Sequence, residues 1–372
     1  MKRFLLLLSC LTAMLGAAAG ACEKPSGAGS ASDEQTAEAV EQETTPTEEG
    51  SGSSGAAEEP VYPKLADIKG TVLAACGSSV LNLIDVDTAL DSGFVAGRLW
   101  RWQAGKHKAE IGSDVTLDHL DECKYVRVAR PADGSEGAAK DSVDAILLTS
   151  SYGWWTIVEY PSGDCLYTGR GVQTHSAELL PGGLIAIANS TGGDTVKLYS
   201  LDDTATELAS LPLTSAHGVV WMEKTKRLYA VGNYSLLVIK LTGLEEGTPA
   251  EQKPGFELEK TISTQGHVYN LHDLTKVDEG TMVLSGYFSS FFDVSTETFS
   301  ETPMQQALNN VKAFNYNSTT GEAWYTCATP SEASESWATR TLRYSNDLSV
   351  AGDVKTIKIP TQDIYKVRVV KW

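Results

Sequence analysis

The chain has 372 residues, with 30 basic and 48 acidic side chains and a formal net charge of −18. This acidic balance argues against a nucleic-acid partner, because binding to phosphate backbones relies on clustered lysine and arginine. The basic residues are spread along the chain, so binding to a membrane surface by charge alone is not expected either.

The first 21 residues have the pattern of an export signal. Lys2 and Arg3 precede an apolar run, and small residues follow up to Ala21. The segment that ends at Cys22 resembles the lipobox of bacterial lipoproteins, in which the cysteine is acylated. This resemblance implies a protein that a lipid on Cys22 anchors to the bacterial cell membrane, facing outside the cytoplasm. The alternative is an ordinary secretory signal and a secreted protein.

Residues 22–60 are expected to form a disordered acidic tether. They hold ten acidic residues and one lysine, and they contain no aromatic residue. Such a segment cannot bury enough apolar surface to fold, and repulsion between its charges should extend it. Residues 61–372 then remain as one folded domain.

This domain is predicted to be all-β, a single β-propeller. Short runs rich in Val, Ile, Leu, Tyr and Trp alternate with turn residues, and the clearest unit, residues 175–213, has four strands in about forty residues. The same pattern predicts six four-stranded blades, with only three strands in the first. The segment from Ile364 to Lys371 would supply the missing strand and close the ring. Seven blades are the alternative.

Four cysteines fall in this domain, namely Cys76, Cys123, Cys165 and Cys327. In an oxidising compartment they could form up to two disulfides. We expect a bridge between Cys76 and Cys327, which end comparable strands. Four buried free thiols are the alternative.

Three of the six histidines, His175, His217 and His272, open equivalent strands in successive blades. The first strand of a propeller blade is innermost, so we expect the three imidazoles to meet at one mouth of the central channel. Alignment on the turn after each strand places Lys124 and Lys312 at the same level. In the remaining blade, Lys366 or Tyr365 would take that place.

Loops between the second and third strands should surround the same mouth with hydroxyl, amide and aromatic groups. The candidates in these loops are Tyr152, Asn189, Asn233, Tyr287 and Trp337. This mixture suits a sugar or another polyhydroxylated or aromatic ligand, because aromatic rings stack on it and short polar groups orient it.

The histidines allow three interpretations. They could brace neighbouring blades, or hold a divalent metal with Glu178 or Asp273 as a further ligand or orienting group. They could also act in acid-base or nucleophilic chemistry on an anionic group. The lysines favour an anion over a metal, because ammonium groups raise the cost of binding a cation.

Two resemblances bear on these alternatives. The strands that begin at His175 and His272 resemble those of bacterial arylsulfate sulfotransferases, six-bladed propellers with catalytic histidines at the channel mouth. Ser176 stands where that family has aspartate. The segments that begin at Ile146, Thr174 and Ala216 are similar to an uncharacterised family of secreted bacterial propellers, which implies the fold but no activity.

Our hypothesis from the sequence is therefore a lipid-anchored, monomeric propeller that binds a small anionic or carbohydrate ligand at the channel mouth. The alternatives are a metal-dependent lyase or hydrolase or a sulfotransferase-like enzyme that uses the central histidines, and a structural scaffold for protein interaction.

Overall fold

The computed structural model describes residues 61–131, 142–244, 253–350, 352 and 355–372. These residues lie in one compact unit, Glu59–Trp372. The expected signal peptide, the tether and Cys22 fall outside the described residues. No helix within the described ranges is long and apolar enough to cross a membrane.

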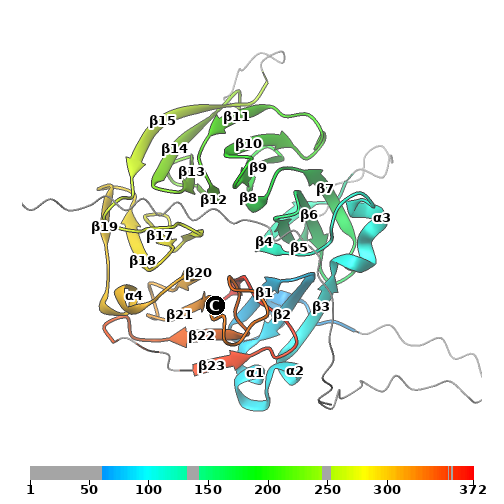
Figure 1. Cartoon of the computed structure of the whole chain (residues 1–372). Coiled ribbons are helices and arrows are strands. Elements are labelled where there is room, and N and C mark those ends of the chain that lie inside the picture. The colour runs from blue at the N-terminus through cyan, green and yellow to red at the C-terminus, as the bar shows by residue number, and fades with distance from the viewer. Residues whose placement is uncertain (1–60, 132–141, 245–252, 351, 353–354) are drawn as a thin grey trace, which may run out of the picture. The chain divides into compact units, whose positions relative to one another are not determined.

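Six four-stranded antiparallel sheets stand in a ring around a central channel, as the sequence predicted (Figure 1). The first three blades, each given from its innermost strand outward, are as follows. Blade 1 contains β24 (Lys366–Lys371), β1 (Val72–Gly77), β2 (Val80–Asp85) and β3 (Arg98–Gln103); blade 2 contains β4 (Leu120–Ala129), β5 (Ser142–Ser150), β6 (Trp154–Glu159) and β7 (Cys165–Arg170); blade 3 contains β8 (Thr174–Leu180), β9 (Leu184–Asn189), β10 (Thr195–Ser200) and β11 (Ala209–Pro212).

The other three blades follow the chain in the same order. Blade 4 contains β12 (Ala216–Met222), β13 (Arg227–Gly232), β14 (Ser235–Thr242) and β15 (Gly255–Ser263); blade 5 contains β16 (Asp273–Lys276), β17 (Thr281–Ser285), β18 (Ser289–Asp293) and β19 (Thr298–Ser300); blade 6 contains β20 (Val311–Tyr316), β21 (Ala323–Cys327), β22 (Thr341–Ser345) and β23 (Lys355–Lys358).

The C-terminal strand closes the ring as predicted. β24 pairs with β1 in antiparallel register, with Cys76 opposite Lys366 and Val72 opposite Lys371. Blade 1 therefore combines the two ends of the described domain, and pairing with β24 covers the inner edge that β1 would otherwise leave open.

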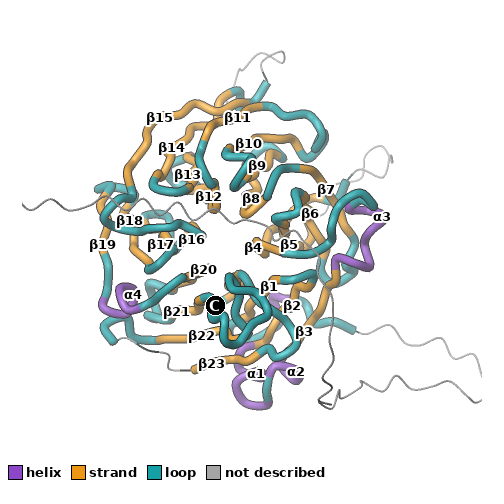
Figure 2. Tube along the Cα trace, in the orientation of Figure 1, coloured by secondary structure: helices purple, strands orange, loops and turns teal. Residues whose placement is uncertain are grey.

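Short helices interrupt the strands at the outer side of the ring (Figure 2). They are η1 (Leu65–Asp67), α1 (Val86–Ser92), α2 (Phe94–Gly97), η2 (Ala104–His107), α3 (Lys108–Ile111) and α4 (Pro303–Ala307). α1 begins where the Asp85 carboxylate accepts a hydrogen bond from the Thr88 backbone N–H, and Gly93 (φ 88°) separates α1 from α2. These two helices occupy residues 86–97, so this stretch adds no strand to the ring.

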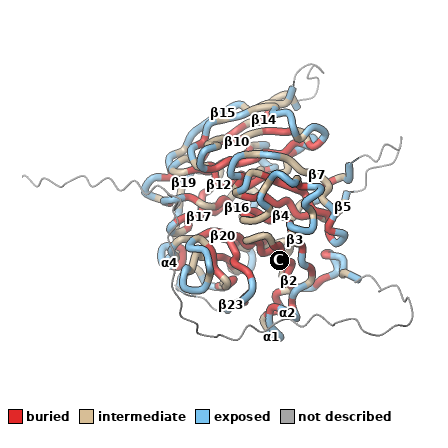
Figure 3. The backbone as a smooth tube through the Cα atoms, turned by 45° about the vertical axis from the view of Figure 1, so that its right-hand side comes forward, coloured by how far each residue is buried: buried red, intermediate tan, exposed pale blue. Residues whose placement is uncertain are grey.

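The hydrophobic core lies between the blades. Each of the six junctions between neighbouring blades holds one cluster of buried apolar side chains, and burial is deepest in the inner and middle strands (Figure 3). Successive residues of a strand point to opposite neighbours. Trp154 thus packs toward blade 1 and Trp155 toward blade 3, and both are fully buried in the core, away from the channel mouth.

No disulfide joins any of these four described cysteines, so the expected bridge between Cys76 and Cys327 is not present. The Cys76 thiol lies in the junction between blades 1 and 2, where its Sγ is 3.7 Å from the carbonyl oxygen of Leu120. Cys327 belongs to the junction between blades 5 and 6. Although both residues end comparable strands, their side chains point into different junctions.

Candidate functional site

The three histidines meet at one mouth of the channel. The ring centroids of His175 and His217 are 4.4 Å apart, and those of His217 and His272 are 5.3 Å apart. Their positions at the start of three neighbouring innermost strands account for this convergence. The structure therefore brings together the residues that the repeat had singled out.

A repeated irregularity of the backbone aims these side chains. In four innermost strands the register shifts by one residue near the start, so that one residue has no partner on the next strand. The four extra residues are Asp121, His175, His217 and Lys312. Such β-bulges redirect a side chain without breaking the sheet, and they are common beside functional sites.

A second backbone feature marks the same level in five blades. Two residues before each of these ring positions, the chain adopts a positive φ. The residues that do so are His119, Gln173, Ser215, Asn270 and Asn310. This turn also precedes His272, which lies one residue before β16, so the ring contains Asp121, three histidines and Lys312.

Tyr365 completes the ring in blade 1. Its ring centroid is 6.1 Å from that of His175 and 5.8 Å from the Lys312 ammonium nitrogen. Lys366, the other sequence candidate for this place, lies deeper in the channel. Its Nζ is 3.1 Å from Asp273 Oδ1 and 3.7 Å from Glu122 Oε2.

Lys124 does not belong to this ring, contrary to the alignment on the following turn. β4 has ten residues and β8 has seven. An alignment on the turn that follows each strand therefore selects Lys124, which lies three positions after the residue at the ring. Asp121 holds the ring position in blade 2, and sequence reasoning missed it. The positive-φ turn before it was the signal, but its residue types vary from blade to blade.

Glu178 and Asp273 do not orient the histidines. Glu178 forms an ion pair with Lys124 at 2.7 Å. Asp273 accepts hydrogen bonds from Arg368 and Thr275 and pairs with Lys366. Both carboxylates are therefore already engaged with other side chains.

Hydrogen bonds fix the tautomers of two imidazoles. His217 Nδ1 lies 2.7 Å from the carbonyl oxygen of Ser215, which can only accept, so Nδ1 carries the proton in the neutral ring. His272 Nε2 faces the Asn270 amide nitrogen at 3.0 Å and Lys312 Nζ at 2.8 Å. Nε2 of His272 thus accepts, and its proton lies on Nδ1. Among the described residues, Nδ1 of His272 and Nδ1 of His175 have no hydrogen-bond partner.

Burial keeps all three imidazoles neutral near pH 7. It lowers the pKa of His217 to about 4, and it holds the pKa values of His175 and His272 well below their usual range, with neighbouring histidines and lysines adding to the effect. Burial, with the charge of Lys366, also lowers the pKa of Lys312 to about 7.

The arrangement does not favour a metal. Within the ranges that the structure covers, no three His, Cys, Asp or Glu side chains are placed to hold a metal ion together. The Lys312 ammonium is the neighbour of the His272 nitrogen that would have to coordinate the ion. This arrangement therefore argues against a divalent metal held by His175, His217 and His272.

Aromatic side chains extend outward from the ring. Tyr365 contacts Trp337 with ring centroids 5.5 Å apart, Trp337 contacts His119 at 5.1 Å, and His119 contacts Tyr152 at 4.9 Å. Tyr152 is 45% exposed, so this aromatic arc runs from the buried ring to solvent.

The other loop candidates have different surroundings. Asn189 is buried, and its carboxamide oxygen accepts from the Val172 backbone N–H, so it braces a turn. Asn233 occupies a turn with φ 29° in blade 4, next to the exposed Tyr234. Tyr287 is 50% exposed, and its backbone N–H donates to the carbonyl of Tyr269, which holds two exposed tyrosines together in blade 5.

Four buried charged residues fill the channel below the ring. Arg368 donates to Glu122 at 2.7 and 2.9 Å and to Asp273, while Lys366 contacts the same two carboxylates. This buried quartet has two positive and two negative groups, all at most 5% exposed. It separates the histidine mouth from the other end of the channel.

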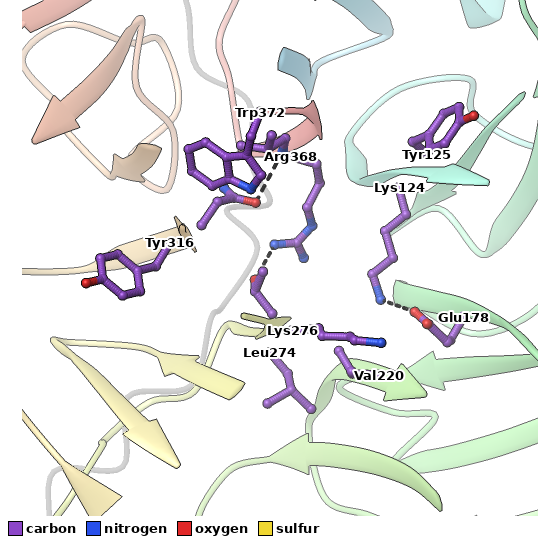
Figure 4. Close-up of a pocket in the computed structure, with 12 residues that line it drawn as sticks. Lys124, Tyr125, Glu178, Val220, Leu274, Lys276, Tyr316, Arg368 and Trp372 are labelled. Atoms are coloured by element: carbon purple, nitrogen blue, oxygen red, sulfur yellow. Dashed lines mark hydrogen bonds and ion pairs between the residues drawn. The ribbon is translucent and has the colours of Figure 1, made fainter. Parts of the chain in front are cut away.

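A pocket of about 200 Å³ opens at that other end (Figure 4). Its lining includes Lys124, Glu178, Asn315, Arg368 and Trp372, and Figure 4 shows Lys124 reaching across to Glu178. Asn315 donates to the carbonyls of Trp324 and Val367. Lys124, Glu178 and Asn315 in this pocket are thus already paired with protein groups.

The sequence of this propeller was also compared with known proteins. A family model described as DUF6528, a family of unknown function, matches residues 138–327. This match spans half of the 372-residue chain and runs from blade 2 to blade 6. No curated protein matches the chain.

Proposed function

The chain belongs to the DUF6528 family, whose function is unknown, and from its own residues we propose that it binds a small ligand with a carboxylate group at the histidine mouth. One observation carries this proposal. Lys312 is 4% exposed, and among the described residues no carboxylate lies within ion-pair distance of its ammonium group. A buried ammonium without a counter-ion is costly, and an anionic ligand would supply the missing charge.

The neighbouring groups support an anionic ligand. The imidazole nitrogens without a partner in His175 and His272 leave hydrogen-bonding capacity unused inside the ring. The buried quartet below is balanced in charge, so it neither repels nor replaces the ligand. Lys366 in the quartet pairs with Asp273. In the opposite pocket Lys124 pairs with Glu178, and Lys276 pairs with Glu279.

The aromatic arc favours a ligand that also carries a ring. Tyr152 and His119 offer faces for stacking beside the polar ring, and the exposed Tyr287 adds another aromatic group in blade 5. A sugar acid or an aromatic acid combines both features. We therefore place the ligand in these chemical classes, and we make no claim of turnover in this proposal.

The proposal is tested by ligand binding to the full chain. We expect glucuronate or benzoate to bind, and glucose or benzyl alcohol to bind at least tenfold more weakly. Lys312→Met should weaken binding of the acids by about tenfold or more, because a charge-assisted hydrogen bond contributes about 1.5–3 kcal/mol. Calorimetric titration measures the dissociation constants.

Two further observations sharpen this test. Lys276→Met is the matched control, since Lys276 is on the surface and paired with Glu279, and it should bind normally. Binding to the wild-type chain should weaken as the pH rises above about 7, because the Lys312 ammonium group of the unliganded protein loses its proton there. Equal binding of acids and neutral analogues, or unchanged binding by Lys312→Met, would refute the proposal.

We also propose that the propeller is anchored by a lipid on Cys22, outside the bacterial cytoplasm. The lipobox-like end of the signal and the acidic tether after it support this location. Cys22→Ala should move the protein from the membrane fraction to the soluble fraction, as measured by fractionation and immunoblotting. Retention in the membrane fraction would contradict the lipid anchor.

A further inference from the structure

We propose that Lys312 forms a covalent imine with a 2-oxo acid, a ligand in which a carbonyl group lies next to the carboxylate. This inference rests on the proposed function and deepens it, because it names the class of acid and the atom that reacts. It gives the ring an activity beyond reversible binding.

The surroundings of Lys312 are those of a reactive amine. It is an extra residue of a β-bulge, so its side chain is held at the ring by the backbone. It is 4% exposed, and its nitrogen is 2.8 Å from the accepting nitrogen of His272. Burial and a nearby positive charge both favour the neutral, nucleophilic form of a lysine.

A comparison with Lys366 separates the roles of the two buried lysines. Lys366 is fully buried but forms ion pairs with two carboxylates, those of Glu122 and Asp273. Lys312 contacts a neutral imidazole instead, while the Tyr365 ring centroid lies 5.8 Å from the ammonium nitrogen of each lysine. The other groups that act on the ionisation of Lys312 are Lys366 and Cys327. Of these two lysines, Lys312 is therefore the one whose nitrogen has no carboxylate within ion-pair distance among the described residues.

The reaction needs no reagent beyond the ligand. The Lys312 nitrogen attacks the carbonyl carbon, forming a C–N bond while the C=O π electrons move to oxygen. His272 Nε2 accepts a proton from the nitrogen and returns it to that oxygen, which gives a carbinolamine. A second proton then reaches the hydroxyl group, and the group leaves as water while the nitrogen forms the C=N bond. The product is a neutral imine when the second proton also comes from the nitrogen, and a protonated imine when it comes from solvent water.

The same chemistry explains why a 2-oxo acid suits this place. A protonated imine is a cation, and among the described residues no carboxylate lies within ion-pair distance of the Lys312 nitrogen. The carboxylate of a 2-oxo acid lies next to the imine carbon and would serve as its counter-ion. The adduct is then close to neutral, which a buried site tolerates better than an isolated charge.

Pyruvate with cyanoborohydride tests the imine on the full chain. Reduction converts the imine into a stable amine that intact-mass and peptide-mass spectrometry detect. We expect Lys312 to be labelled at least tenfold more than Lys276, with a labelling rate that rises through about pH 7. Lys312→Arg should abolish the label at this position. His272→Gln should slow labelling of Lys312 at least tenfold.

Lactate has the carboxylate but no ketone carbonyl, so it can bind at the site and cannot form an imine. If lactate binds and pyruvate leaves no adduct on Lys312, the imine is refuted and the binding function stands. If neither acid binds and no adduct forms, both are refuted. An adduct spread evenly over surface lysines also refutes the imine. Circular dichroism of each variant checks that it is folded.

Discussion

Asp121 and Lys312 lie in the same ring and ionise near the same pH, although their ordinary pKa values differ widely. Burial raises the pKa of the Asp121 carboxyl to about 7 and lowers that of the Lys312 ammonium to about 7. Both shifts have the same cause, because an environment that excludes water disfavours either charge. The ring can therefore change its protonation within a narrow range around neutrality.

Asp121→Asn should reveal, in the pH dependence of stability, the free-energy cost of burying the ionised Asp121 carboxylate. In the wild-type chain, folded Asp121 keeps its proton up to about pH 7 while the unfolded carboxyl loses it near pH 4. In the wild type, Asp121 should therefore lower the free energy of unfolding as the pH rises from about 4 to 7. In the variant, the asparagine does not ionise, so this contribution to the pH dependence should be absent. Relative to wild type, Asp121→Asn should gain about 2–4 kcal/mol over this window.

Urea unfolding at pH 4.5 and pH 8 measures this difference. Asp114→Asn is a suitable control, because Asp114 pairs with Arg170 on the surface. Its difference from wild type should change by less than about 1 kcal/mol between the two pH values. A constant difference for Asp121→Asn across the two pH values would contradict the expected ionisation.

At this scale the sequence predicted part of the ring. The spacing of His175, His217 and His272 was sufficient to bring them together, because each opens an innermost strand. Asp121 was missed and Lys124 misplaced, since a bulge inserts one residue and strand lengths differ between blades. The equivalent positions in the different blades share a positive φ two residues earlier, and the residue types at that turn vary, so the sequence does not reveal it.

At the scale of the elements, β24 is held both by backbone pairing with β1 and by side-chain contacts to other blades. Its Arg368 joins Glu122 of β4 to Asp273 of β16, so one side chain connects three innermost strands. Removing one member of a buried ionic network leaves the others uncompensated, which commonly costs about 3–5 kcal/mol. The quartet therefore contributes to the relative placement of blades 1, 2 and 5.

We expect Arg368→Met to lower the free energy of unfolding by about 3–5 kcal/mol, because it leaves Glu122 and Asp273 short of positive charge. Arg227→Met breaks the ion pair between the partly exposed side chains of Arg227 and Glu259, and it should cost less than about 1 kcal/mol. Chemical denaturation of the two variants gives both values. Equal small losses would mean that the quartet adds little to stability.

The sequence could not have shown the quartet. Glu122, Asp273, Lys366 and Arg368 lie up to 246 residues apart, and no local pattern links them. Their acidic and basic character would ordinarily predict exposed positions. Only the convergence of six innermost strands on one axis brings them into contact.

For the whole propeller, the ring depends on its last strand. The number of blades and the closure by residues 364–371 were predictable, because one blade lacked a strand and the C-terminal segment lacked a blade. The hydrophobic junctions between blades follow from the same repeat, since every strand alternates its side chains between two neighbours.

A chain that ends at Asp363 should not form a stable monomer. It would lack β24 and expose the inner edge of β1, which favours aggregation. A chain that ends at Lys371 keeps all of β24 and should remain folded. Size-exclusion chromatography and thermal unfolding of both chains test this, and a folded monomer of the shorter chain would contradict it.

The β-bulge at the start of the innermost strands separates recognition from architecture. The extra residue takes no part in strand pairing, so its identity can change while every paired neighbour stays the same. Aspartate, histidine and lysine already occupy this place in different blades of one molecule. Relatives could therefore diverge in what they bind by exchanging single residues at these places, and a library that varies them together would explore new specificities on one unchanged scaffold.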